Sequence, residues 1–243
     1  MKTIQGHHKM KPLFAGASLL LLALAACAPA AAPVAETTPA VEAPAAPTPV
    51  AITVPAGDYV VDPTHASVTF KLQHLGLSHY ALRFKTYDAT VSFDPANIAA
   101  SKVTASIKPS DLVVGYPADY VKNHPGTKFK SWEDDLANST NFLDAAKFPA
   151  ITFTSTSVEP SGERTAKVTG DLTLKGVTKP VTLDVTFSGE TASHYFAKVP
   201  AVGFSATGTF KRSDFGFDYL LPAVVGDDVQ VEIEGDFIQK VAQ

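Results

Sequence analysis

The sequence has little of what builds disulfide-bonded, membrane-spanning or nucleic-acid-binding proteins. Its 243 residues include one cysteine, Cys27, so the chain cannot close an intramolecular disulfide and must rely on an apolar core. Its most apolar run, residues 13–26, is shorter than the roughly 20 residues that a membrane-spanning helix needs. The 20 basic and 24 acidic residues give a formal net charge of −4, which argues against a nucleic-acid-binding surface.

Common catalytic and metal-binding motifs are also missing. No His-x-x-x-His or His-x-His pair accompanies the single cysteine, so the sequence predicts no metal site. The glycine motifs that bind phosphates and dinucleotides are absent, and residues 203–208 miss the Gly-x-Ser-x-Gly elbow by one position. We therefore expect neither catalysis nor a cofactor. His65 follows an Asp-Pro-Thr segment, which favours a local turn role for its side chain.

The start of the chain has the pattern of an export signal. Lysines precede an apolar run of signal-peptide length, and small residues precede Cys27. The Leu-Ala-Ala-Cys tetrapeptide at residues 24–27 resembles the bacterial lipobox, which implies cleavage before Cys27 and a diacylglycerol on its sulfur. The alternative is an ordinary signal peptide cut near Ala26, with an incidental cysteine.

The next segment, residues 27–56, is of different composition. Prolines alternate there with alanine, valine and threonine, which favours an extended, semi-rigid linker. The sequence thus predicts a signal peptide at 1–26, a lipidated Cys27 with a linker at 27–56, and a folded domain at 57–240. Because Ala28 is not acidic, we expect an exported protein anchored in the outer membrane and facing the periplasm.

Alternation of apolar and polar residues with period two dominates residues 57–240. Such alternation is typical of antiparallel strands with one buried and one solvated face. Turn-forming segments separate the runs, and no long helical repeat intervenes, which argues against a βαβ architecture. Eight antiparallel strands can close into a barrel or pack as a sandwich. The alternating runs lie at residues 68–72, 87–93, 103–107, 151–154, 168–174, 181–187, 204–210 and 229–234.

The stretch from 115 to 147 breaks this pattern. Ser131, with Asp134 three residues later, predicts the start of a helix. Residues 141–147 could form a second helical turn that stops before Pro149. We expect short helices and loops over one end of the sheet.

The domain carries five motifs in order. They are Asp-Pro-Thr-His at 62–65, His-Leu-Gly-Leu-Ser at 74–78, Asn-Phe-Leu-Asp-Ala-Ala-Lys-Phe-Pro at 141–149, Gly-Asp-Leu-Thr-Leu-Lys-Gly-Val-Thr-Lys-Pro at 170–180 and Phe-Lys-Arg-Ser-Asp-Phe-Gly at 210–216. Taken together they resemble the YceI-like family of lipocalin-like proteins, over essentially residues 57–240. The chain departs from the family pattern at Leu82, where glycine is usual, and at 116–132, which is longer than the usual connection.

The resemblance implies an all-β fold, an extended eight-stranded antiparallel barrel with a hydrophobic lumen, in a periplasmic or secreted protein. Members of the family are associated with polyisoprenoid or related long-chain lipids and are not known for catalysis. We therefore expect the domain to bind and carry an isoprenoid-type lipid in the cell envelope, attached to a membrane through its lipid anchor. Two alternatives are a structural or stress-related envelope lipoprotein without a transported ligand, and a lipid-modifying enzyme.

The apolar strand faces supply the candidate lumen. Small residues at Gly170, Ala206 and Gly208 would leave a gap, which natural cores avoid unless something fills it, although glycine there can also mark a bend. Lys211 and Arg212 could meet a lipid head group, or could be solvated cations at a turn. Tyr116 and Trp132 could flank a mouth, or could simply cover the end of the barrel. The candidate lumen residues are Phe70, Leu72, Phe93, Ile107, Phe153, Gly170, Leu172, Phe187, Phe204, Ala206, Gly208 and Phe210.

Overall fold

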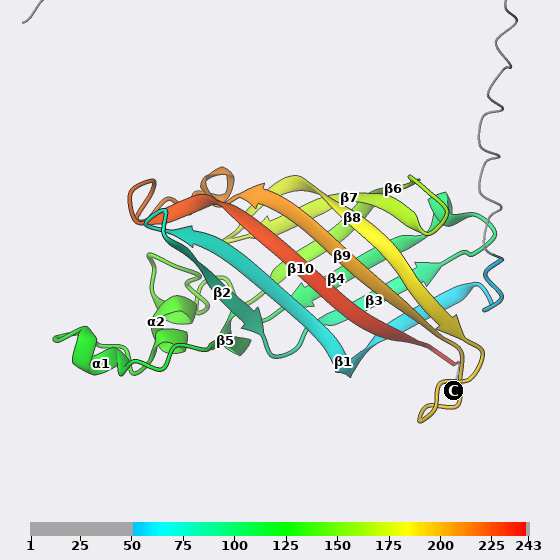
Figure 1. The fold of residues 1–243 in the computed structure, drawn as a ribbon, viewed down its shortest axis with the longest axis horizontal. Coiled ribbons are helices and arrows are strands. Elements are labelled where there is room, and N and C mark those ends of the chain that lie inside the picture. Colours follow the sequence, from blue (N-terminus) through cyan, green and yellow to red (C-terminus); the bar gives the residue numbers. More distant parts are fainter. Residues whose placement is uncertain (1–50, 242–243) are drawn as a thin grey trace, which may run out of the picture. The chain divides into compact units, whose positions relative to one another are not determined.

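The computed structural model describes residues 51–241 (Figure 1). The expected signal peptide, Cys27 and most of the expected linker lie outside these residues, so their assignments stay predictions. Within the described range, no helix is long and apolar enough to cross a membrane.

The described residues form ten strands, and every strand pairing is antiparallel. The predicted all-β fold is therefore confirmed. The strands are β1 (Gly57–His74), β2 (Ser78–Phe84), β3 (Asp88–Phe93), β4 (Lys102–Ile107), β5 (Leu112–Val114), β6 (Ile151–Pro160), β7 (Thr165–Leu174), β8 (Val177–Thr191), β9 (Ala201–Lys211) and β10 (Val225–Gln239).

A closed barrel is formed by β1, β10, β9, β8, β7, β6, β4 and β3, in that order and back to β1 (Figure 1). The predicted eight-stranded barrel is confirmed. One half of β1 pairs with β3 through residues 57–60, and the other half pairs with β2 through residues 68–74. β2 pairs with residues 68–74 of β1, and β5 pairs with β2, so these two strands extend the sheet beyond the ring. Neither strand is among the eight predicted runs.

The alternation in the sequence becomes an inner and an outer face of the barrel wall. On β10, Val229, Val231 and Ile233 line the interior. The intervening Glu232 lies outside, where its Oε1 is 2.6 Å from Lys71 Nζ on β1. Such opposite-charge pairs between neighbouring strands hold the register of the sheet while the apolar faces form the core.

Two short helices, α1 (Tyr120–Asn123) and α2 (Trp132–Asn138), lie at the end of the barrel that carries β2 and β5 (Figure 1). The predicted cap of α2 is confirmed, because Ser131 Oγ accepts a hydrogen bond from Asp134 N at 3.2 Å. The expected helical turn at 141–147 is wrong, since these residues form successive turns. Three 3₁₀ turns complete the elements: η1 (Ile98–Ala100), η2 (Pro109–Asp111) and η3 (Arg212–Phe215).

The opposite end of the barrel is closed by residues that the sequence assigned to the linker. Val54 is 3% exposed and packs in the core cluster, and Pro55 O accepts a hydrogen bond from the Tyr59 hydroxyl at 2.7 Å. The Glu190 carboxylate accepts hydrogen bonds from Thr53 N and Thr53 Oγ1, each at 2.8 Å. The packed domain therefore begins before residue 57. The proline content of residues 27–56 predicted a linker and gave no sign that Val54 is buried.

Candidate functional site

A cavity of about 510 Å³ lies inside the barrel, and nearly all of its lining is apolar. Strands from around the whole ring contribute to it, and so do β2, β5 and the helical segment. Its volume falls in the range of roughly 300–1,000 Å³ that is typical of small-molecule sites. The predicted lumen residues that line it are Phe70, Leu72, Phe93, Ile107, Phe153, Leu172, Phe204 and Phe210.

The small residues do not make this cavity in the way that the sequence suggested. Gly170, Ala206 and Gly208 are not among the lining residues. A Cβ atom at Gly170 would collide with the Phe153 ring, and one at Gly208 would lie 2.6 Å from Leu183 Cδ2. The expected gap at the two glycines is therefore wrong, since larger side chains from adjacent strands occupy that space.

Phe187 is the other predicted lumen residue that does not line the cavity. It is 8% exposed, and its ring centroid lies 6.2 Å from that of Phe93 and 5.7 Å from that of Phe204. The Arg164 guanidinium lies 5.4 Å from the centre of the Phe187 ring. Phe187 thus belongs to the aromatic packing at the closed end of the barrel.

The cavity reaches the surface at the opposite end, near the loop between η3 and β10. Tyr219 and Leu220 both line the cavity and are 41% and 37% exposed. This loop is joined to the β1–β2 turn by a hydrogen bond from Leu75 N to Val224 O at 2.8 Å. In that turn Leu75 and Leu77 are exposed as well, so apolar side chains surround this part of the rim.

Trp132 lies in the lining at the helical end of the cavity. α2 is held against β5 by a hydrogen bond from Val114 N to Glu133 Oε1 at 3.1 Å, and this contact fixes the position of the neighbouring Trp132. The Trp132 ring packs edge-on against the rings of Tyr116 and His124, with centroids 5.8 and 4.8 Å away.

Tyr116 carries a polar atom that its surroundings leave without a partner. Among the described residues, its hydroxyl is the only buried side-chain nitrogen or oxygen without a hydrogen bond. Its ring lies between those of Tyr80 and Trp132 and lines the cavity. Burial raises the pKa of Tyr116 to about 12, so the phenol stays protonated and its hydroxyl can donate a hydrogen bond. Unpaired buried polar groups are costly, which makes this hydroxyl a candidate contact for a ligand.

The other polar groups in this part of the lining are largely occupied. Asp135 Oδ2 accepts a hydrogen bond from the Tyr120 hydroxyl at 2.7 Å. His124 Nδ1 lies 2.9 Å from Tyr120 O, within hydrogen-bond distance. Sequence reasoning missed His124 and Asp135, because the stretch from 115 to 147 has no strand periodicity that could assign a side chain to the interior.

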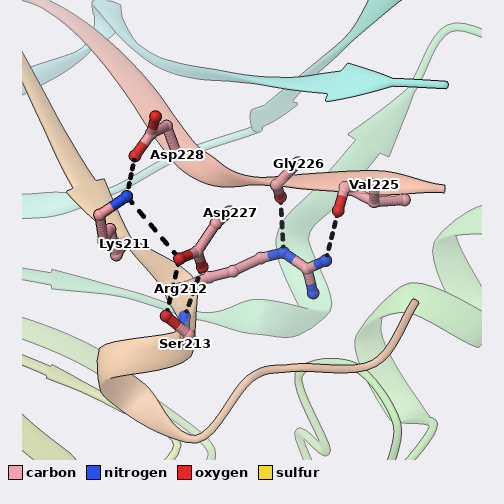
Figure 2. A network of polar contacts seen from close by, with 7 residues as sticks. All are labelled: Lys211, Arg212, Ser213, Val225, Gly226, Asp227 and Asp228. Atoms are coloured by element: carbon pink, nitrogen blue, oxygen red, sulfur yellow. Dashed lines mark hydrogen bonds and ion pairs between the residues drawn. The ribbon is translucent and has the colours of Figure 1, made fainter. Parts of the chain in front are cut away.

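The structure gives specific partners to the two cations considered for a head group (Figure 2). Lys211 lies on the outside of β9, where its Nζ is 2.9 Å from Asp228 Oδ1. Arg212 is 3% exposed and reaches the lining, and its guanidinium donates to four backbone oxygens. These acceptors are Gly226 O at 2.9 Å, Val225 O at 3.0 Å, Tyr219 O at 2.9 Å and Phe217 O at 3.1 Å.

These contacts make Arg212 a clamp for the loop that borders the opening. The neighbouring Ser213 adds to it, because Asp227 accepts hydrogen bonds from Ser213 N at 2.9 Å and Ser213 Oγ at 2.8 Å (Figure 2). Most of the guanidinium hydrogens are committed to the backbone, which leaves little donor capacity for a ligand.

Comparison with known proteins agrees with this architecture. The chain matches the YceI-like domain over residues 59–237. A UPF0312 protein of Pseudomonas savastanoi pv. phaseolicola is 40% identical over 180 residues, which are 73% of this chain and 85% of that protein. Burkholderia cenocepacia BcnA is similar in structure, with a TM-score of 0.59 and 25% identity over 72% of this chain and 98% of that chain.

A second solved structure shares the fold at low sequence identity. It is a polyisoprenoid binding domain from Saccharophagus degradans, with a TM-score of 0.51 and 11% identity. The match covers 76% of this chain and all of that one (100%). The barrel, its internal cavity and the family match agree, and the chain therefore belongs to the YceI-like family.

Proposed function

We propose that this protein binds a long-chain isoprenoid-type lipid in its barrel and carries it in the cell envelope, without catalysis. The observation that carries the proposal is the apolar cavity inside a closed barrel, open near Tyr219 and Leu220. The S. degradans domain of the same fold is described as polyisoprenoid-binding, which supports this class of ligand.

The energetics favour a long tail. Each buried carbon unit contributes about 0.8 kcal/mol, so three isoprene units contribute roughly 10 kcal/mol before costs. Association itself costs about 4–15 kcal/mol in lost freedom. A single unit, at about 4 kcal/mol, only matches the lower bound of this cost. Each further unit adds about 4 kcal/mol, so short tails should bind poorly and affinity should rise with tail length.

We further propose that the head group is neutral and polar, and that it lies beside Tyr116. The unpaired Tyr116 hydroxyl can donate to a carbonyl or hydroxyl oxygen. Among the described lining residues, Arg212 is the only side chain with a permanent positive charge, and its donors bind backbone oxygens. Asp135 adds a carboxylate to the same lining. A phosphate would meet little compensating charge there, and burying an unpaired anion is costly.

The membrane attachment is part of the same proposal. A diacylglyceryl group on Cys27, with a further acyl chain, would give the two or more chains that stable anchoring needs. Radioactive palmitate should label the wild-type protein, and Cys27→Ser should either leave the precursor uncut or release the protein from membranes. A wild-type protein that stays soluble and unlabelled would show that the anchor assignment is wrong.

The test of the ligand is mass spectrometry of an organic extract of the native protein. We expect an isoprenoid with a neutral head, present in a stoichiometric amount. Extracts without any apolar ligand from cells of several growth phases would contradict carriage, and turnover of an extracted lipid or ester by the pure protein would replace it with an enzymatic function.

A further inference from the structure

A bulge in β1 holds two potential metal ligands outside the lumen. From Val61 to Ala66, β1 moves five positions along its sequence. The paired positions on β10 differ by only two residues, from Phe237 to Gly235. Residues 62–65, with the sequence Asp-Pro-Thr-His, therefore project from the ladder. None of these residues lines the barrel cavity.

Local hydrogen bonds fix the carboxylate of the bulge. Asp62 is 8% exposed, and its Oδ1 accepts hydrogen bonds from Thr64 N at 2.9 Å and Thr64 Oγ1 at 2.7 Å. Its Oδ2 lies 2.8 Å from His65 Nδ1. One carboxylate oxygen is thus held by its surroundings, and the other points at an imidazole whose side chain is half exposed.

The loop between β8 and β9 brings a second imidazole to the same place. His194 is half-buried, and its ring centroid lies 6.5 Å from that of His65. The hydrogen bonds from His194 N to Val199 O at 2.7 Å and from Lys198 N to His194 O at 2.9 Å shape the loop around it. One potential ligand atom from each of Asp62, His65 and His194 lies within 4.8 Å of the other two.

We propose that Asp62, His65 and His194 bind a divalent transition-metal ion such as Zn²⁺. Two imidazoles and one carboxylate form a donor set that suits zinc and its neighbours, and three protein ligands leave a position for water. Asp62 Oδ1 accepts hydrogen bonds from Thr64, and these would hold the carboxylate in the orientation that its ligating oxygen needs. In metal sites, hydrogen bonds to the ligands commonly play this role. Asp236 on β10 adds further negative charge near His65.

The required movement is small. A tetrahedral ion with ligands at about 2.1 Å holds them about 3.4 Å apart. His194 must therefore approach, and the 2.8 Å contact between Asp62 Oδ2 and His65 Nδ1 must open by a few tenths of an ångström. His194 can approach because it belongs to a surface loop rather than to a strand. Ligation through Nε2 would place the ring proton on Nδ1 and break the long 3.3 Å hydrogen bond from Ala197 N, a modest loss. The bound ion would join the β8–β9 loop to β1.

The experiment is isothermal titration of Zn²⁺ into the full-length chain, purified without export so that residues 1–26 are retained. His7, His8 and Cys27 are replaced by alanine in every variant, because a histidine pair and a free thiol would compete for zinc. We expect one saturable site in this background and binding weakened by more than about tenfold in His194→Ala and Asp62→Asn. His79→Ala, which removes an exposed histidine of β2, should bind as the background does. Zn²⁺ should also raise the melting temperature of the background protein and not that of His194→Ala.

The outcomes are decisive because His194→Ala alters only a surface loop and should leave the barrel folded, even if Asp62→Asn proves unstable. Absence of saturable binding, or equal Zn²⁺ affinity in His194→Ala and the background, would overturn the site. Lipid binding by these variants should be unchanged, which separates this site from the lumen.

Discussion

At the scale of the residue, the proposed head-group contact depends on the Tyr116 hydroxyl. Buried polar groups usually have a hydrogen-bond partner, and the proposal gives this hydroxyl one in the ligand head group. Tyr116 lies in the stretch where the sequence departs from the family pattern, so the resemblance could not assign it a role. The sequence suggested a mouth there from the presence of aromatic residues, but only the packing of Tyr80 and Trp132 around the ring reveals the unpaired hydroxyl.

We predict that Tyr116→Phe separates stability from affinity. Removing an unpaired buried hydroxyl should leave the free protein as stable as before, or raise its free energy of unfolding by about 1–3 kcal/mol. Binding of an isoprenoid with a neutral polar head should weaken by about tenfold, because the ligand loses a hydrogen-bond donor. Thermal melting and ligand titration would measure the two effects, with Tyr219→Phe at the exposed rim as the control. Unchanged affinity in Tyr116→Phe would remove the head-group contact from the proposal.

At the scale of the element, the period-two alternation predicted the strands of the ring and their inner faces. That alternation cannot say how far an inward side chain extends, which is why Gly170 and Gly208 suggested a gap that Phe153 and Leu183 occupy. It also gives no information on contacts between distant segments. The group formed by Asp62, His65 and His194 depends on a bulge and a loop that are far apart in sequence, so residue spacing could not predict it.

The close packing of β6 on β7 gives a direct test. Gly170→Ala should lower the free energy of unfolding by about 1–3 kcal/mol, because the added Cβ would lie 2.6 Å from Thr154 O and would also collide with the Phe153 ring. Gly189→Ala in β8 is the matched control, since nothing lies within 4 Å of its added Cβ. Chemical denaturation of both variants would measure the difference. Equal stability of the two would mean that the space beside Gly170 is empty, as the sequence had suggested.

The loop clamp at η3 should make stability depend on pH through Asp227. Burial opposes ionisation of this carboxyl, but hydrogen bonds from Ser213 and the charges of Lys211 and Arg212 outweigh it and hold the pKa below its usual 3.8. The ionised carboxylate therefore stabilises the fold above about pH 4, and this contribution is lost as pH falls through the lowered pKa.

Asp227→Asn should accordingly lower the free energy of unfolding by about 1 kcal/mol at neutral pH. The difference from the wild type should shrink as the pH falls below 3.8, where the wild-type carboxyl becomes protonated. Melting curves between pH 2.5 and 7, at about half-unit steps, would measure it. A difference that stays constant across this range would show that ionisation of Asp227 does not contribute.

At the scale of the whole molecule, the barrel is closed at one end and open at the other. Val54 and the aromatic packing around Tyr59 and Phe93 close one end, whereas exposed Tyr219 and Leu220 mark the opening. A chain that begins at residue 57 should therefore melt below one that begins at residue 51. Losing the burial of Val54 alone costs about 1.5–3 kcal/mol, or several degrees for a protein of this size. Equal melting temperatures would place Val54 outside the cooperative fold.

The lumen hypothesis is tested most directly by titrating the protein with isoprenoid alcohols of increasing length. Ala105 on β4 lines the cavity, and Ala105→Phe should fill it, while Thr104→Phe places the same ring on the exposed outer face as a control. We predict that affinity rises with tail length in the wild type and in Thr104→Phe, and that Ala105→Phe loses binding while its melting temperature stays near that of the wild type. Affinity that is independent of length, or equal binding by Ala105→Phe, would contradict a lipid-binding lumen.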